Sequence, residues 1–303
     1  MLELIKPGFF FDFMKVKWYA LTFSIIISLI AITSIVISGF SYGIDFAGGT
    51  VVQVRFARSV KADEVRVALK SIGLANERIQ SVGQPQDNEF LLRTAKSEDS
   101  MQGMSEKIKE ALVKSFGLEN VQIQRVEMVG GAVSQDIKNK GFLSLFYASL
   151  LILVYIWLRF DFKYSIGAIV ATLHDVIVVL GVFSLLGKEM DLTVVASFLT
   201  LIGYSLNDTV VVFDRIRENV KKQTSSNFDM AYVMSSSISQ TLSRTILTSL
   251  TVFIVALILF LFGGAVIHNF ALVMLIGTII GCYSSIFVAS PIVLFFSKEK
   301  AKA

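Results

Sequence analysis

Six runs of mainly apolar residues are spaced along this chain of 303 residues, and most have the length of one bilayer crossing. A helix needs about 20 apolar residues to cross a hydrocarbon core about 30 Å thick. Of all residues, 54% are hydrophobic and only 17% are charged, which excludes an ordinary water-soluble domain. We therefore predict an α-helical polytopic membrane protein with six transmembrane helices, at about 18–38, 142–158, 164–186, 192–213, 242–262 and 266–296. The last run is long for one crossing, so we expect it to be tilted or to project from the membrane.

Basic residues in the short loops predict the orientation of these spans. On one side they are Lys6, Lys15, Lys17, Arg159, Lys163, Arg215, Arg217, Lys221, Lys222, Lys298, Lys300 and Lys302. The short loops opposite carry Lys188 alone, although Lys138 and Lys140 lie near the membrane on that side. The positive-inside rule then makes both termini cytoplasmic, as a segment 1–17 and a tail 298–303. The first run is too long for a signal peptide and lacks a clear cleavage site, so it is predicted to be an uncleaved anchor.

The polar stretch 39–140 is the one region outside the spans with the size of a domain. Patterns typical of strands occur at 50–56, 78–82, 89–93 and 121–126, and amphipathic helical patterns occur at 61–72 and 101–116. This β-α-β-β-α-β order predicts an α+β ferredoxin-like domain, which the orientation above places in the periplasm. Such a domain could bind an extended polypeptide at a sheet edge or act as a rigid spacer, and the sequence favours neither.

Composition also excludes several classes of function. Cys282 is the single cysteine, and His174 and His268 are far apart, so the sequence shows neither a disulfide framework nor a metal site. The segment 181–188 lacks the glycine spacing and the Ser or Thr of a phosphate-binding loop. Cytoplasmic loops explain most of the net charge of +4, without a nucleic-acid partner. We therefore expect no enzymatic activity, no cofactor and no bound nucleic acid.

A few ionisable side chains lie within the spans, where each costs roughly 2.5–3.5 kcal/mol. His174 and Asp175 lie in the third span, Asn207 and Asp208 in the fourth, and Arg244 opens the fifth. A carboxylate in a low-dielectric site binds or releases a proton when helix packing changes around it, which suits a proton relay. The alternatives are a structural Asp208–Arg244 ion pair that joins two helices, and interior hydrogen bonds for His174 and Asp175.

Two further patterns favour structural roles. Gly277 and Gly281 in the sixth span have the spacing of closely packed helices, either within the chain or with a partner. The stretch FDRIREN at 213–219 continues the fourth span into the cytoplasm, where its arginines can anchor the helix.

Four motifs, in this order and with this topology, resemble the SecF family of bacterial protein translocase subunits, which is related to the resistance-nodulation-division exporters. They are GIDFAGGT at 43–50, GYSLNDTVVVFDRIREN at 203–219, TLSRT at 241–245 and YSSIF at 283–287. In that family the Asp of the N-D-T motif and the Arg of the T-L-x-R-T motif are associated with proton-driven function, and these match Asp208 and Arg244. One departure is VGGAVS at 129–134, where the family often has V-G-P-x-V-G. It puts in doubt the rigidity of the connection between the polar domain and the second span.

The resemblance implies a subunit of the bacterial inner membrane that forms a heterodimer with SecD and assists the SecYEG channel and SecA. Its further partners would be the exported unfolded polypeptide and membrane lipids. We predict that it uses the proton gradient to promote protein export, with Asp208 and Arg244 in the relay and Asp175, His174 and Asn207 as weaker candidates. The alternatives are a scaffold that stabilises the translocase without energy coupling, and half of a small-molecule exporter. The sequence leaves the coupling ion open between H⁺ and Na⁺.

Overall fold

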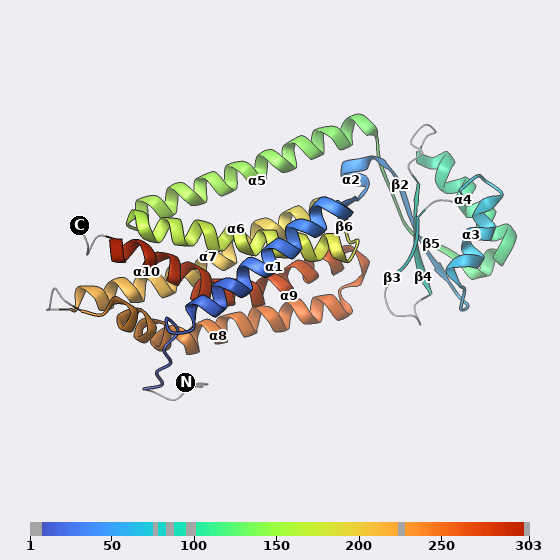
Figure 1. The fold of residues 1–303 in the computed structure, drawn as a ribbon. Helices are drawn as coiled ribbons and strands as arrows, with labels where there is room; N and C mark the ends of the chain where they lie inside the picture. Colours follow the sequence, from blue (N-terminus) through green and yellow to red (C-terminus); the bar gives the residue numbers. More distant parts are fainter. Residues whose placement is uncertain (1–7, 75–77, 83–87, 95–100, 224–227, 300–303) are drawn as a thin grey trace.

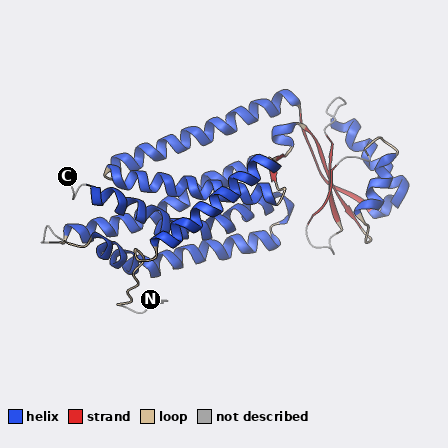
Figure 2. Ribbon diagram, viewed as in Figure 1, coloured by secondary structure: helices blue, strands red, loops and turns tan. Residues whose placement is uncertain are grey.

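The computed structural model describes residues 8–74, 78–82, 88–94, 101–223 and 228–299. Long helices form an elongated bundle, and a small domain with a sheet lies at one end of it (Figures 1 and 2). Of the residues that predicted the orientation, Lys6, Lys300 and Lys302 lie outside the described residues. Helix α1 begins, and α10 ends, at the end of the bundle away from the small domain (Figure 1).

Six helical segments of the described chain are long and apolar enough to cross a membrane, which confirms the predicted number. They are α1 (Lys17–Ser38), α5 (Gly131–Arg159), α6 (Phe162–Leu185), α7 (Leu192–Lys221), α8 (Met230–Phe262) and the composite segment Val266–Ser297. The composite segment consists of α9 (Gly264–Ser284), the π-helical turn η2 (Ser285–Ala289) and α10 (Ser290–Glu299).

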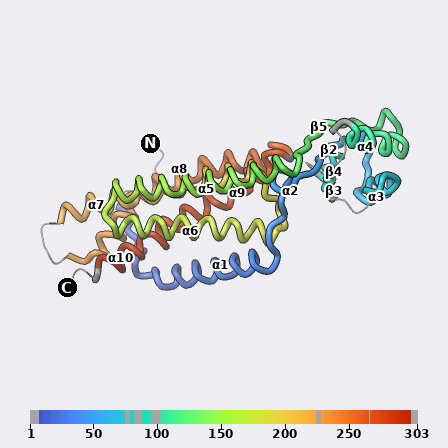
Figure 3. Tube along the Cα trace, turned by 90° about the horizontal axis from the view of Figure 1, so that it is seen from above, coloured from blue at the N-terminus to red at the C-terminus, as the bar shows by residue number. Residues whose placement is uncertain are grey.

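Burial separates the six segments into central and peripheral helices. The most apolar windows of α6, α7 and the composite segment are 50%, 56% and 67% buried, whereas those of α1, α5 and α8 are 17%, 11% and 17% buried. Helix α1 lies along one flank of the bundle beside α6 (Figure 3). Because hydropathy is high in all six, these fractions show which helices have their apolar surface facing outward rather than into the chain.

Several helices extend beyond the apolar runs that predicted them. Helix α5 begins at Gly131 rather than 142, and α7 continues to Lys221 rather than 213. Helix α8 begins at Met230 rather than 242, so Arg244 lies well inside a continuous helix rather than at its first turn. The reason is that hydropathy marks only the apolar part of a helix, whereas backbone hydrogen bonding continues through polar residues at its ends.

The small domain contains a four-stranded antiparallel sheet with the strand order β3-β4-β2-β5. Its elements are β2 (Gly49–Phe56), α3 (Ala62–Lys70), β3 (Arg78–Val82), β4 (Glu89–Thr94), α4 (Met101–Phe116), the short 3₁₀ helix η1 (Leu118–Asn120) and β5 (Val121–Val129). This is the predicted β-α-β-β-α-β order. Helices α3 and α4 cover one face of the sheet, and the other face is turned toward the helix bundle (Figure 1).

Alternation along the strands explains why one face carries the core of this domain. Val52, Val54 and Phe56 of β2 are almost completely buried and belong to one cluster with residues of α3 and α4. Gln53 and Arg55, which alternate with them, belong to the opposite face. The face turned toward the bundle therefore carries polar side chains.

Candidate functional site

Asp208 lies near the middle of α7 and is only 2% exposed. Its Oδ2 atom accepts a hydrogen bond of 3.2 Å from Ser249 Oγ of α8, and Ser249 accepts one of 2.9 Å from the Tyr204 hydroxyl. Within the described residues, no ion pair within 4.0 Å joins Asp208 to Arg244. The Asp208 carboxyl group is therefore hydrogen-bonded to a neutral hydroxyl group of α8, and no direct ion pair joins it to that helix.

Arg244 and Asn207 lie on the outer surface of the described chain. Thr200, Gly203 and Asn207 are exposed at one-turn intervals along α7, and Gln240 and Arg244 are exposed on the neighbouring α8. A charged or polar side chain facing hydrocarbon is costly, whereas small and polar residues on a helix surface suit contact with another helix. This polar and small-residue face, defined by those five residues, has the composition of a helix-packing surface.

Asp175 and His174 form a second buried cluster, in α6. Asp175 Oδ2 accepts hydrogen bonds from Ser205 Oγ of α7 at 2.5 Å and from Ser284 Oγ of α9 at 2.8 Å. Asp175 Oδ1 lies 3.0 Å from His174 Nδ1, and these two residues are 0% and 8% exposed. His174 Nε2 has no hydrogen-bond partner within the described chain. Asp175 therefore connects the three central helices.

Within the described residues, no continuous chain of hydrogen bonds joins the two clusters. Ser205 contacts Asp175, whereas Asp208, one turn further along α7, contacts α8. A third contact joins α7 to the π-helical turn, where Thr209 Oγ1 and Ser285 Oγ are 2.8 Å apart. This turn is not predicted from the sequence. A π-helical turn is often found at a functional site, but the apolar pattern gives no signal for it.

Gly277 and Gly281 bring α9 close to α7 within this chain. A Cβ atom at Gly277 would overlap the side chain of Leu201, and one at Gly281 would lie 3.5 Å from the Cα atom of Ser205. Close approach at Gly281 keeps α9 beside the α7 serine that binds Asp175. The glycines thus lie at an internal helix contact of the central cluster.

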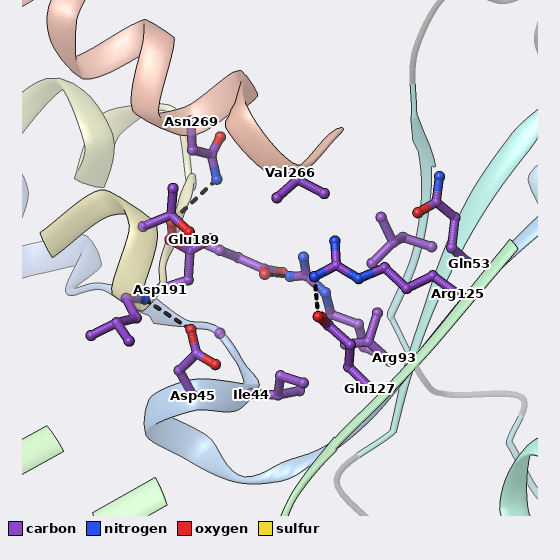
Figure 4. A pocket seen from close by; sticks show the side chains of 15 residues that line it. Ile44, Asp45, Gln53, Arg93, Arg125, Glu127, Glu189, Asp191, Val266 and Asn269 are labelled. Carbon is purple, nitrogen blue, oxygen red and sulfur yellow. Dashed lines mark hydrogen bonds and ion pairs between the residues drawn. The ribbon is translucent and has the colours of Figure 1, made fainter. Parts of the chain in front are cut away.

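The GIDFAGGT motif forms a joint between the sheet domain and the N-terminal end of α7, which is called the outer end below. The short strand β1 (Ser41–Tyr42) pairs in parallel with β6 (Glu189–Met190), and the helical turn α2 (Ile44–Ala47) follows. Asp45 Oδ2 accepts a hydrogen bond of 2.9 Å from the Leu192 backbone N–H, the first residue of α7 (Figure 4). Gly48 and Gly49 have φ values of 74° and 122°, which favour glycine, as the chain turns into β2.

Asp191 caps the same helix end. Its Oδ1 atom accepts a hydrogen bond of 2.8 Å from the Val194 N–H. Burial raises the pKa of the Asp191 carboxyl above its ordinary value, although the Val194 hydrogen bond opposes this effect. The roles of Asp45 and Asp191 were not predicted from the sequence, although an Asp directly before an apolar helix is a recognisable N-cap signal.

The end of α7 opposite the joint is held by charged and polar side chains. Arg159 Nη2 lies 2.9 Å and 3.0 Å from the two carboxylate oxygens of Asp214, and Arg217 donates to the Arg159 carbonyl oxygen. Arg215 donates to Gln240 of α8 at 2.6 Å. These contacts give the stretch 213–219 a helix-joining role.

Comparison with known proteins identifies the family. The family model described as "Protein export membrane protein SecD/SecF, C-terminal" matches residues 108–299, and the "SecD/SecF GG Motif" model matches residues 33–60. Protein translocase subunit SecF of Thermodesulfovibrio yellowstonii is 42% identical over 291 residues, which cover 95% of each chain. The SecF of Magnetococcus marinus is 43% identical over 100% of this chain and 98% of its own length.

A solved structure supports the same assignment. The crystal structure of SecDF from Thermus thermophilus superposes with a TM-score of 0.84 at 33% identity, over 96% of this chain. The chain spans only 39% of that SecDF chain. Two family models, full-length relatives and a shared fold agree, and the chain therefore belongs to the SecF family of protein translocase subunits.

Proposed function

We propose that this chain is an accessory subunit of the Sec translocase that pairs with SecD and uses the proton gradient to promote protein export. It acts in the bacterial inner membrane, with both termini in the cytoplasm. Its further partners are the SecYEG channel and SecA. The sheet domain is ferredoxin-like and periplasmic, and it meets the exported polypeptide. The chain supplies no enzymatic step and needs no cofactor. Support for the translocase role comes from the SecF relatives and from the likeness to SecDF.

The observation that carries the proton role is the environment of Asp208. The carboxyl group lies on a membrane-crossing helix, is buried by the neighbouring helices and accepts a hydrogen bond from the Ser249 hydroxyl. A hydroxyl donates to a carboxylate and accepts from a carboxylic acid, so this contact serves both protonation states. An intramembrane carboxyl without a direct ion pair is free to exchange a proton when the neighbouring helices move.

Arg244 and Asn207 act at the proposed contact with SecD. They belong to the polar and small-residue face of α7 and α8, which a partner helix would shield from lipid. Arg244 then supplies a positive charge near the relay that responds to the position of the partner. His174 and Asp175 lie inside the bundle of this chain, so their part in the relay is to couple movement of α6, α7 and α9 to Asp208.

Export of a secretory protein into inverted membrane vesicles tests the role of Asp208. Asp208→Asn keeps the size of the side chain and removes the exchangeable proton. With normal recovery of the SecD complex, we expect it to lose the part of export that requires the proton gradient. The matched control is Asp136→Asn, which removes an exposed carboxylate of α5 that pairs with Lys140 on the surface. That control is expected to retain gradient-dependent export.

Two other results would contradict this proposal. Full gradient-dependent export by the Asp208→Asn protein excludes Asp208 as the coupling group. Parallel loss of complex recovery and export, whether or not the gradient is present, supports a structural scaffold instead. Repeating the assay with a sodium gradient in place of the proton gradient identifies the coupling ion.

A further inference from the structure

A cleft of about 290 Å³ separates the sheet domain from the outer end of the helix bundle. Figure 4 shows that side chains from both bodies project into it. Arg93 of β4 and Arg125 of β5 enter from the open face of the sheet, and Asp45, Glu189 and Asp191 enter from the bundle side. Opposite charges therefore face each other across the cleft.

The chain connections hold one side of the sheet domain. Strand β1 pairs with β6, and Asp45 binds the first backbone N–H of α7, immediately before the chain enters β2. The chain leaves the domain through β5, which neighbours β2 and leads directly into α5. Both covalent connections thus lie at the β2–β5 side of the sheet, and β4 lies on the other side of β2.

Arg93 forms a non-covalent contact on that other side. It pairs with Glu189 of β6, and the two side chains are 24% and 6% exposed. Ion pairs buried to this degree are screened little by salt, and removal of one partner leaves a buried charge without compensation. The pair joins a strand of the sheet domain to the short segment between α6 and α7.

Glu189 occupies a point where two central helices meet the joint. Its carbonyl oxygen accepts a hydrogen bond of 3.3 Å from Asn269 of α9, and Asp191, which follows closely, caps α7. Helix α7 carries Asp208 and Ser205, and α9 carries Ser284. A force on Glu189 therefore acts on the outer ends of both helices that contribute to the buried clusters.

We propose that the Arg93–Glu189 ion pair is a releasable interdomain contact that transmits the position of the sheet domain to the outer ends of α7 and α9. Closed, it holds the open face of the sheet against the bundle. Open, it leaves the domain attached through the joint at β1, β6 and Asp45. The inference deepens the proposed function, because α7 carries the carboxyl group to which proton binding is assigned.

The test uses spin labels on the full chain, assembled with SecD in lipid nanodiscs. One label is attached at Val67→Cys on α3 and the other at Leu186→Cys at the outer end of α6, two exposed positions, in a Cys282→Ser background. Pulsed electron resonance then gives the distribution of distances between the domain and the bundle. Gradient-dependent export is measured on the same variants without labels.

Charge reversal distinguishes a direct contact from a general structural effect. Arg93→Glu and Glu189→Arg are each expected to broaden the distance distribution toward longer distances and to lower gradient-dependent export. Combined, they restore the opposite charges, and we expect recovery of the short-distance population by about two-fold or more over either single variant. Arg125→Glu is the matched control, because Arg125 lines the same cleft but pairs with Glu127 of its own strand. It should leave the distribution unchanged.

The outcomes separate this inference from the proposed function. The interdomain contact would be overturned if the single charge reversals kept the wild-type distance distribution. It would also be overturned if the double variant had no larger short-distance population than either single variant. If the single variants fail to assemble with SecD, the neutral pair Arg93→Gln and Glu189→Gln replaces them, and an unchanged distribution again overturns it. Asp208→Asn is run in parallel. If that variant retains full export, the proton role fails whatever the distances show.

Discussion

At the scale of single residues, two half-buried carboxylates lie together at the N-terminus of α7. Asp191 caps the helix through Val194, and Asp45 binds Leu192, so two carboxylates lie where the helix dipole is positive. Burial nevertheless raises the pKa of Asp191. The folded protein therefore holds the Asp191 proton more tightly than the unfolded chain does.

The sign of the resulting pH dependence follows by linkage. As pH rises from the ordinary value of 3.8 through the raised pKa, ionisation of Asp191 opposes folding, so its contribution to stability falls in this window and returns on acidification. Asp191→Asn keeps a hydrogen-bond acceptor for Val194, and we expect it to remove this dependence. Asp191→Ala also removes the cap, which should cost about 1 kcal/mol. Thermal unfolding in detergent, followed by tryptophan fluorescence from pH 4 to 7, compares the three proteins. An Asn variant with the wild-type pH slope would contradict the assignment.

At the scale of elements, glycines set the closest helix contacts. A Cβ atom at Gly181 of α6 would overlap the backbone of Ala31 in α1, whereas one at Gly277 would overlap only the flexible side-chain end of Leu201. Beside the first contact, Ser34 and Ser184 form a hydrogen bond of 3.1 Å between the same two helices. The α1–α6 contact therefore has less room to adjust than the α9–α7 contact.

This difference predicts an order of stability for two alanine variants. Gly181→Ala should displace α1 from α6 and lower stability by about 1–3 kcal/mol, the usual cost of overpacking. Gly277→Ala should cost less, because Leu201 can change rotamer and alanine favours a helix by about 1 kcal/mol. Gly130→Ala is the control, since a Cβ atom there meets no atom within 4 Å. Unfolding temperatures in detergent measure the order. A Gly181→Ala protein as stable as the control would show that the two helices separate easily.

At the scale of the whole molecule, α7 and α8 expose a polar and small-residue face that is poorly suited to contact with lipid. Thr200, Gly203 and Asn207 are exposed on α7, whereas its other faces pack against the chain. A Cβ atom at Gly203 meets no atom of the described chain within 4 Å. Small residues leave room for a second helix to approach closely, so this face fits a partner rather than acyl chains.

A bulky side chain at this face should therefore affect assembly and not folding. We expect Gly203→Leu to reduce recovery of the SecD complex about ten-fold or more, as loss of about 1.4 kcal/mol or more would. The unfolding temperature of the isolated chain should stay within about 2 °C of wild type, since a surface change costs within about 0.5 kcal/mol. Val36→Leu, at an exposed position of α1, is the control. Normal co-purification of Gly203→Leu with SecD would place the partner on another face.

The sequence alone is sufficient to predict the number of spans and the order of elements in the sheet domain, because both depend on local periodicity and length. It also selected Asp208, Asp175 and His174, since an ionisable residue within an apolar run is visible without any structure. Their partners were not visible. Ser249 and Ser284 are ordinary helix residues until packing places them against a carboxyl group.

Tertiary packing sets how these parts meet. It placed Asp175 between three helices, left Arg244 on the outer surface without a direct ion pair to Asp208, and joined Arg93 to Glu189 across a cleft. The two-residue strands β1 and β6 are too short to have a sequence pattern, and their pairing depends on helix ends that approach from distant parts of the chain. Local periodicity fixes which face of an element is apolar. Which polar groups meet across two elements depends on their packing, because those contacts join residues far apart in sequence.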